Sequence, residues 1–272
     1  EAVGAQVVYG IVGLKTHAKL LLVTRREGAR LVRYGHLSTG NYNVRTARLY
    51  TDLSYLTADE EITADMDGVF SHLASQNRPP KLRQLILAPF HLQRRMLEKI
   101  DQVAQAASRG EDTRIVVKMN ALTDEALIRA LVRAGQCGVR IDLIVRGACM
   151  LPAQVPGATA NIRVRSIIGR FLEHARVFYF RDGEDETLYL SSADWMNRNM
   201  LRRIELAWPV TDPALRRRII DECLVAALHD GRDAWDLGPD GTYRRVDATL
   251  PGHGAQAALM ARYAAGRVAQ DT

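Results

Sequence analysis

Strand-length apolar runs alternate with helix-length amphipathic runs along most of this chain. Runs rich in Val, Ile, Leu, Tyr and Phe predict β-strands, and they lie at residues 5–11, 18–25, 29–37, 84–90, 114–122, 139–148, 161–168, 175–181, 187–193 and 202–210. Runs with helical periodicity lie at residues 57–76, 91–110, 123–138, 211–231 and 254–267. This alternation is typical of an α/β fold, in which helices cover the faces of a sheet.

Polar residues mark where several of these helices are expected to begin. Thr57 and Glu60 have the spacing of a capping box. Thr123 and Thr211 are predicted N-caps, and Pro213 falls in the first turn of its helix, where its missing N–H costs nothing.

The proline pair in "SQNRPPKLR" (75–83) stops the preceding helix and is the best candidate for a linker. It divides the chain into a first domain, 1–78, and a second domain, 79–272. The chain begins without Met and almost inside a predicted strand. We therefore expect that it is cut from a longer protein and that its first domain is truncated at its N-terminus.

The same short pattern opens two of the predicted strands. His17 and Lys19 stand two residues apart before the run "LLLVT", and His174 and Arg176 stand two residues apart before "VFYF", about 157 residues later. Side chains two apart on a strand point to the same face. Each histidine is therefore expected to share its face with a cation.

The two copies also continue alike. Each is followed by a predicted hairpin and a polar turn, "STGN" (38–41, ending in Asn41) and "SSAD" (191–194). Asp52 lies eleven residues after the end of the first turn, and Glu205 lies eleven residues after the end of the second. A chance origin is plausible for any one of these elements but much less so for their ordered recurrence.

The repeated residues suit phosphoryl transfer. A histidine can act as a nucleophile when a carboxylate, here Asp52 or Glu205, holds its other ring nitrogen. A neighbouring cation would bind phosphate oxygens, and the amide of Asn41 and the turn hydroxyls could donate further hydrogen bonds. Two copies that face each other across a pseudo-twofold would place two imidazoles on opposite sides of one phosphorus.

Each element alone has a simpler interpretation. A histidine at a strand end is usually a hydrogen-bonded surface or core residue, and a serine-rich turn is usually only a turn. The remaining histidines have no counterpart in the repeat and are expected to be structural; these are His36, His72, His91, His229 and His253. Single arginines that could line a basic channel are more simply explained by a solvated face; these are Arg48, Arg176, Arg198 and Arg203.

Net charge, cysteine content and the length of the apolar runs indicate which partners and which cell compartment suit the chain. The net charge of +6 and the pI near 9.4 favour acidic partners such as nucleic acid or phosphates, although a merely soluble basic surface explains them equally well. The cysteines, Cys137, Cys149 and Cys223, are odd in number and form no CxxC pair, which argues against a zinc site or a disulfide framework and fits the cytoplasm. No apolar run reaches membrane-spanning length, and the N-terminus does not read as a signal peptide.

The paired His-x-basic pattern resembles the phospholipase D superfamily, whose enzymes form phosphohistidine intermediates. That resemblance implies two phospholipase D-like α/β domains, with mixed sheets flanked by helices and related by a pseudo-twofold. The hydrolase members continue the motif to an aspartate five residues after the lysine, with four residues between the two. Thr24 and Arg181 stand at those positions, and Arg176 replaces the second lysine.

A more specific resemblance is to the C-terminal catalytic half of the histidine-dependent type 1 polyphosphate kinases. The matching segments follow that family's order and cover nearly the whole chain: "GLKTHAK", "RYGHLSTGNYN", "TARLYTDLSYLTAD", "LIVRGAC", "LEHARV" and "LSSADWMNRN". The resemblance implies that His17 is the autophosphorylated histidine. It also implies that Tyr50, Arg146 and His174 contact the nucleotide or its phosphates. The residues that this family associates with magnesium and adenine would lie upstream of residue 1.

The predicted function is reversible transfer of the γ-phosphoryl of ATP through His17 to the end of polyphosphate, with Mg²⁺ as a charge neutraliser bound largely through phosphate oxygens. The expected partners are ATP, ADP and inorganic polyphosphate, without nucleic acid. The full-length enzyme is expected to form homo-oligomers, with peripheral membrane association as a further expectation. The rival hypotheses are a phosphodiesterase of the phospholipase D or nuclease type and a catalytically silent polyanion-binding module.

Overall fold

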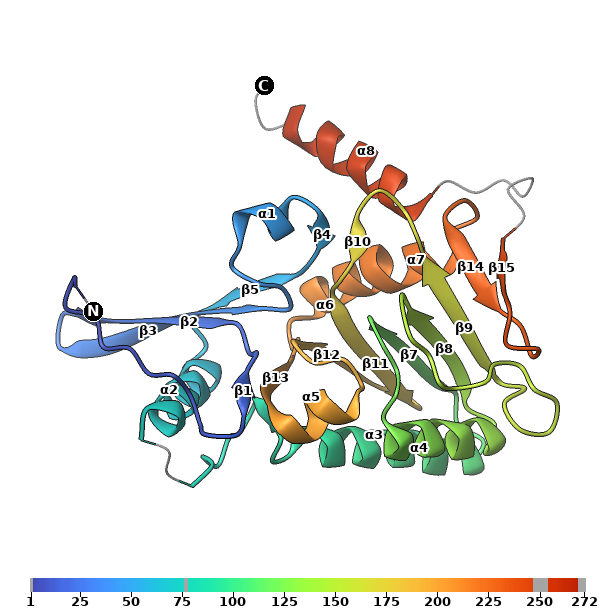
Figure 1. The fold of residues 1–272 in the computed structure, drawn as a ribbon, viewed down its shortest axis with the longest axis horizontal. Helices are drawn as coiled ribbons and strands as arrows, with labels where there is room; N and C mark the ends of the chain where they lie inside the picture. The colour runs from blue at the N-terminus through green and yellow to red at the C-terminus, as the bar shows by residue number, and fades with distance from the viewer. Residues whose placement is uncertain (1, 76–77, 247–253, 269–272) are drawn as a thin grey trace.

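The computed structural model describes residues 2–75, 78–246 and 254–268, with the side chains of 266–268 left aside, and shows a mixed α/β fold (Figure 1). A large mixed sheet of ten strands runs in the order β1-β13-β12-β11-β7-β8-β9-β14-β15, with β6 also paired to β13. Its strands are β1 (Lys15–Thr16), β6 (Ile86–Ala88), β7 (Thr113–Met119), β8 (Arg140–Val145), β9 (Ile162–Ile167), β11 (Arg176–Asp182), β12 (Asp185–Ser191), β13 (Arg203–Pro209), β14 (Ala234–Leu237) and β15 (Tyr243–Arg245). The predicted α/β class is confirmed.

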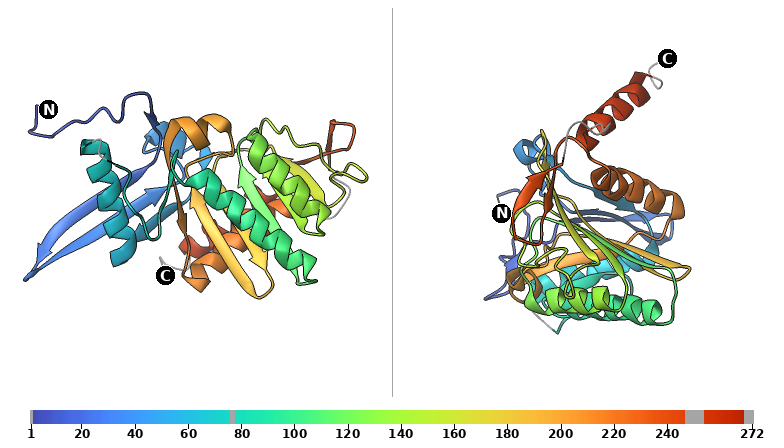
Figure 2. Two further views of the ribbon diagram at one scale, coloured as in Figure 1. Left: turned by 90° about the horizontal axis from the view of Figure 1, so that it is seen from below. Right: turned by 90° about the vertical axis from the view of Figure 1, so that its right-hand side faces the viewer.

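Alternating apolar side chains of the central strands feed two hydrophobic cores on opposite faces of this sheet. On one face α3 (Leu92–Ser108) and α4 (Glu125–Gln136) pack side by side, as both figures of the whole fold show (Figures 1 and 2). The other face is covered by a helical run made of α6 (Pro213–Ile219), a π-helical turn (Ile220–Val225) and α7 (Ala226–Leu228). The sheet is therefore buried on both faces, as continuous apolar strands require.

The N-terminal part adds a smaller layer. Strands β2 (Leu20–Glu27), β3 (Arg30–Ser38) and β5 (Ser54–Thr57) form an antiparallel sheet against which α2 (Glu60–Ser75) packs. The β2–β3 hairpin projects away from the large sheet (Figure 1). The predicted hairpin after His17 is confirmed.

Two short parallel pairings tie the N-terminal part to the rest. Strand β1 adds to the large sheet beside β13. Strand β4 (Tyr50–Thr51) pairs with β10 (Leu172–Glu173) as a separate two-stranded sheet. Because each pair joins segments more than 100 residues apart, these two contacts decide which side chains of the two parts meet.

Several local predictions need correction. Residues 5–11 are not a strand, and Val7, Val8 and Tyr9 are exposed, so the apolar run lacks the burial that a strand prediction presumes. The short helices α1 (Val44–Ala47) and α5 (Asn197–Arg202) were not predicted. Helix α8 (Ala255–Val268) agrees with the prediction. Among the described residues, no helix is long and apolar enough to cross a membrane.

The N-caps also differ from the prediction, always by a nearby aspartate. The side chain of Asp59 accepts from the backbone N–H of Ile62, so Asp59, and not Thr57, caps α2. Asp124 caps α4 and Asp212 caps α6, each one residue after the predicted threonine. Aspartate and threonine are both good caps, so the sequence alone could not choose between neighbours.

Candidate active site

His17 is held in place by the pairing of β1 with β13. The backbone N–H groups of His17 and Ala18 both donate to the carbonyl of Ile204, at 2.9 Å each. This places the His17 ring beside the next residue of β13, Glu205, and Nδ1 lies 2.9 Å from Glu205 Oε2.

Glu205 is fully buried and its two oxygens are well supplied with donors. Ser192 Oγ donates to Oε2 at 2.5 Å, and Asn199 Nδ2 donates to Oε1 at 2.7 Å. A carboxylate can only accept, so it fixes the imidazole as the tautomer with the proton on Nδ1. The lone pair of His17 then lies on Nε2, which is the arrangement that a nucleophilic histidine needs.

His174 is held in the same manner by the pairing of β4 with β10. Its backbone N–H donates to the carbonyl of Thr51 at 3.2 Å, and its ring Nδ1 lies 2.9 Å from both carboxylate oxygens of Asp52. Thr39 Oγ1 donates to Asp52 Oδ1 at 2.7 Å, as Ser192 does to the other carboxylate.

The carboxylates are exchanged between the two copies of the repeated pattern. Glu205, from the copy that contains His174, holds His17, and Asp52, from the copy that contains His17, holds His174. Each parallel strand pair causes one of these exchanges, because β1 lies beside β13 and β4 lies beside β10. Neither histidine is therefore oriented until the two parts of the chain have met.

Lys19 brings an unpaired cation to His17. Its ammonium lies 3.0 Å from each ring nitrogen of His17, and no carboxylate of the described residues forms an ion pair with it. Burial lowers the pKa of Lys19 from 10.5 to about 8, with Glu205 and Asp52 opposing this shift and Arg176 adding to it. The carbonyl of Lys19 accepts from the Ser38 N–H at 3.0 Å, and the next residue, Thr39, donates to Asp52, which holds His174, so a short chain of hydrogen bonds links the two histidine clusters.

Arg176 occupies the corresponding position beside His174 but is already paired. Its Nε donates to Asp194 Oδ1 at 3.1 Å, and its Nη2 donates to Asp194 Oδ2 at 2.9 Å. Its Nη1 donates to the carbonyl of Thr39 at 3.2 Å. Asn41, the residue that corresponds to Asp194 in the first turn, is exposed. The cation beside His17 is therefore free to bind an anion, whereas the one beside His174 is largely neutralised.

The pKa of His174 lies below its ordinary value. Burial is the main cause, and the nearby guanidinium of Arg176 adds to it, while the hydrogen bond to Asp52 opposes both. A neutral imidazole is therefore favoured at neutral pH in the substrate-free protein.

Two further predicted residues lie at the same site. The ring of Tyr50 stacks obliquely on that of His174, with 4.9 Å between centroids. Arg146 reaches the site through Asn120, because Arg146 Nε donates to Asn120 Oδ1 at 3.0 Å and Asn120 Nδ2 donates to the His174 carbonyl at 3.1 Å. Asn41 lies at the end of its turn and is exposed.

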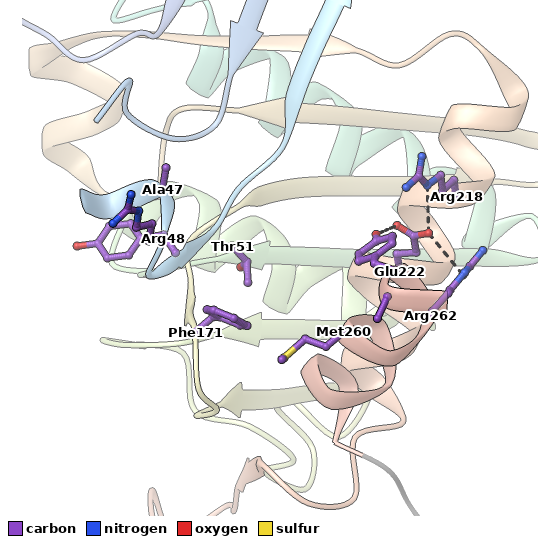
Figure 3. A pocket seen from close by; sticks show the side chains of 11 residues that line it. Ala47, Arg48, Thr51, Phe171, Arg218, Glu222, Met260 and Arg262 are labelled. Atoms are coloured by element: carbon purple, nitrogen blue, oxygen red, sulfur yellow. Dashed lines mark hydrogen bonds and ion pairs between the residues drawn. The ribbon is translucent and has the colours of Figure 1, made fainter. Parts of the chain in front are cut away.

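A large open cavity of about 1020 Å³ lies next to Tyr50 (Figure 3). Arg48 lies on one side of it, and Arg218 and Arg262 lie on the other, where both pair with Glu222. Among the residues that line the cavity, Arg48 is the exposed cation nearest in sequence to Tyr50. Arg48 is also one of the arginines that the sequence offered as candidates for a basic channel.

Sequence reasoning missed several residues that support the site. Asn199 lies within the segment "LSSADWMNRN", so its place near the second turn was a usable signal. Asn120, Lys118 and Gln256 carry no local pattern, because each reaches the site only through long-range packing.

Comparison with known proteins identifies the family. Residues 1–79 match the model of polyphosphate kinase C-terminal domain 1, and residues 85–256 match that of polyphosphate kinase C-terminal domain 2. The chain belongs to the polyphosphate kinase family. The polyphosphate kinase of Pseudomonas putida is 50% identical over 92% of this chain, and that of Paraburkholderia phytofirmans is 49% identical over 97% of it.

The fold agrees with a solved polyphosphate kinase. The crystal structure of the enzyme from Porphyromonas gingivalis matches 94% of this chain with a TM-score of 0.87 and 37% identity. The chain spans only 34% and 39% of the two curated relatives, and 40% of the solved chain. The matched region therefore corresponds to one part of a polyphosphate kinase.

A Mg²⁺ ion held by the protein alone would need several oxygen ligands from its side chains and backbone. Among residues 2–75, 78–246 and 254–268, no three Asp, Glu, His or Cys side chains gather into a metal-binding group. Asp52 and Glu205 are already engaged by histidine and hydroxyl donors. The described residues do not form a cage for a divalent cation.

Proposed function

We propose that this chain carries the phosphoryl-transfer site of a polyphosphate kinase. Nε2 of His17 attacks the γ-phosphorus of ATP, an N–P bond forms as the bond to the bridging oxygen breaks, and ADP leaves. A terminal oxygen of polyphosphate then attacks that phosphorus, the N–P bond breaks, and the chain is one unit longer. The proton on Nδ1 stays in the hydrogen bond to Glu205 through both steps.

The unpaired ammonium of Lys19 is the observation that carries this assignment. It lies at His17 and can move onto phosphate oxygens as negative charge develops in the transition state. Arg176 Nη1 also lies 3.1–3.2 Å from the ring nitrogens of His174, but Asp194 holds Nε and Nη2 of the same guanidinium and the Thr39 carbonyl accepts from Nη1, so this cation is less free to move than Lys19. The asymmetry supports His17 as the nucleophile and leaves His174 to hold the transferring group from the far side, or to protonate it when the imidazole carries its second proton.

The other site residues then take binding roles. Tyr50 and Arg146 are proposed to contact the nucleotide or its phosphates, with Asn41 as a further hydrogen-bond donor. The substrates are proposed to be ATP, ADP and inorganic polyphosphate, not nucleic acid. Mg²⁺ is proposed to enter as a charge neutraliser bound largely through phosphate oxygens.

We propose the division into domains at 1–78 and 79–272, related by a pseudo-twofold. The matched hydrogen bonds of the two histidine clusters support this relation, down to Thr39 and Ser192 as equivalent hydroxyl donors. A cytoplasmic location, homo-oligomers of the full-length enzyme and peripheral membrane association are further proposals from the family relationship.

Labelling with ATP that is radioactive at the γ-phosphorus tests the proposal in the full-length protein. We expect acid-labile, base-stable label on the wild type and on His174→Ala, and none on His17→Ala. Label that persists in His17→Ala would contradict the assignment. Phosphodiester cleavage without nucleotide would instead favour a phospholipase D or nuclease activity, and polyphosphate retention without any label would favour a silent polyanion-binding module.

A further inference from the structure

A glutamine of the last helix completes the short strand β10, which ends directly before His174. Strand β10 pairs with β4 along one edge. At the other side, Gln256 Oε1 accepts from the Phe171 N–H at 2.9 Å, and Gln256 Nε2 donates to the Phe171 carbonyl at 2.8 Å. A peptide group of a neighbouring strand would make the same two bonds, so the side-chain amide takes the place of a third strand.

The same amide enters a buried network beneath the site. Gln256 Nε2 also donates to Glu173 Oε1 at 2.6 Å. Glu173 Oε2 accepts from Lys118 Nζ at 2.5 Å and from Thr51 Oγ1 at 3.0 Å. The backbone N–H of His174 in turn donates to Thr51 Oγ1 at 3.3 Å.

Burial makes this network sensitive to the loss of any member. Gln256, Glu173 and Lys118 are each less than a tenth exposed. Burial tends to raise the pKa of Glu173, but Lys118 and the hydrogen bonds from Lys118, Gln256 and Thr51 hold it below its ordinary value. A buried carboxylate that loses a donor pays the desolvation cost without the compensating bond.

Gly169 leaves room for this contact. A Cβ at Gly169 would lie 2.5 Å from Gln256 Oε1. The backbone of Gly169 is not in the left-handed region, so space, not conformation, requires glycine here. An alanine at this position would therefore displace the amide without straining the chain.

The first turn of α8 is itself anchored. The N–H of Ala255 donates to the buried Asp230 Oδ2 at 2.6 Å. Farther along, Arg262 and Tyr263 both bind Glu222, from the π-helical turn behind the large sheet. These contacts hold α8 in place, and with it the backbone of Gln256.

We propose that Gln256 is a positioning residue of the transfer site, which holds β10 and through it the His174 imidazole and the stacked Tyr50 ring. The proposal rests on the proposed function, because the site that Gln256 positions is the phosphoryl-transfer site. Among the described residues, the hydrogen bonds of the Gln256 side chain go to Phe171 and Glu173 and not to either histidine ring, so it is proposed to act through Phe171, Glu173 and Thr51.

The test uses the full-length protein with Gln256→Ala, Gly169→Ala, the double variant, and Gln93→Ala as a matched control. Gln93 makes the same kind of amide-to-carboxylate bond, to Asp124 at 2.8 Å, at the start of α4. Gln256→Ala, Gly169→Ala and the double variant are called the clamp variants. We expect each of them to slow transfer from ATP to polyphosphate about tenfold per folded molecule, because a small misplacement of a reacting group lowers the rate strongly. Gln93→Ala should keep the wild-type rate.

Two further measurements distinguish a positioning role of Gln256 from a general loss of structure. Histidine NMR titration should show the pKa of His174 rising towards its ordinary value in the clamp variants, because water reaches the opened network. Gly169→Ala should have no further effect once Gln256 is alanine, because the clash has been removed. Additive losses, or a wild-type His174 titration in both single variants, would overturn the proposal.

The titration needs no substrate, so it reports on the clamp even if the proposed function fails. That failure would show instead as missing His17-dependent label in the wild type. If Gln256→Ala does not fold, Gln256→Asn, which keeps the amide but shortens its reach, is measured in the same way. A wild-type rate per folded molecule and a wild-type titration in that variant would also overturn the proposal.

Discussion

At the residue scale, the site depends on which carboxylate holds which histidine. Glu205 and Asp52 each serve the histidine of the other copy. The two carboxylates should therefore have separable effects, although both have one hydroxyl donor and one imidazole partner.

Glu205→Gln should slow phosphohistidine formation by about 10²–10⁴-fold, because an amide can present its N–H to Nδ1 and force the wrong tautomer on His17. Asp52→Asn is the matched change at the other carboxylate. It should leave His17 able to form phosphohistidine while later transfer to polyphosphate slows. Rapid-quench labelling separates the two steps, and an equal loss of label in both variants would speak against the exchanged pairing.

Lys19 is expected to lower the free energy of unfolding, although phosphoryl transfer requires it. Its pKa in the folded protein is about 8, against 10.5 ordinarily. Below pH 8 the lysine is charged in both states, so the folded state bears the full penalty of burying the charge. Between pH 8 and 10.5 the folded state releases the proton first, and stability rises with pH.

Lys19→Met should therefore raise the free energy of unfolding at pH 7 by on the order of 3 kcal/mol, while it abolishes phosphoryl transfer. The gain should shrink as pH rises from 8 to 10.5. Urea unfolding at several pH values measures it. A gain that does not change with pH would show that the penalty comes from packing and not from the charge.

At the element scale, short pieces of secondary structure do the positioning. Strands β1, β4 and β10 have two residues each, yet they place both histidines. The sequence predicted both histidines, both cations and both carboxylates, because the repeat is visible locally. It could not predict the exchange of carboxylates, because that depends on parallel pairing between segments distant in the chain.

The limits of local patterns are also clear elsewhere. The run at residues 5–11 has strand composition, but Val7 and Val8 are exposed, so composition alone was misleading. Gln256 looks like any polar residue of an amphipathic helix, and only the approach of α8 to β10 gives it a partner.

The N-cap of α6 offers a test at this scale. Asp212→Ala should lower the free energy of unfolding by about 1 kcal/mol, because the Leu215 N–H loses its acceptor. Thr211→Ala is the control and should change stability little. Thermal unfolding compares the two, and a larger loss in Thr211→Ala would restore the sequence-based cap assignment.

At the scale of the whole molecule, the site exists only where the two parts of the chain dock. Besides the two short strand pairings, one buried residue links the two parts. Asp65 of α2 accepts the backbone N–H groups of Arg83, Gln84 and Leu85, at 2.7–3.0 Å, just before β6 enters the large sheet.

Asp65→Ala should cost roughly 3 kcal/mol of unfolding free energy, because these N–H groups lose a charged acceptor and that of Leu85 is buried. It should also slow phosphoryl transfer per folded molecule, since His17 would be less firmly held against Glu205. Asp67, whose exposed carboxylate bonds Arg33, provides the control variant Asp67→Ala. Unchanged transfer in folded Asp65→Ala would show that the strand pairs alone hold the two parts together.

The most direct test of the account is to locate the phosphoryl group in the labelled full-length protein by phosphorus and nitrogen NMR after mass-spectrometric assignment of the peptide. With Nδ1 bound to Glu205, the phosphorus should be on Nε2 of His17. Phosphorus on Nδ1 of His17, or on either nitrogen of His174, would contradict it.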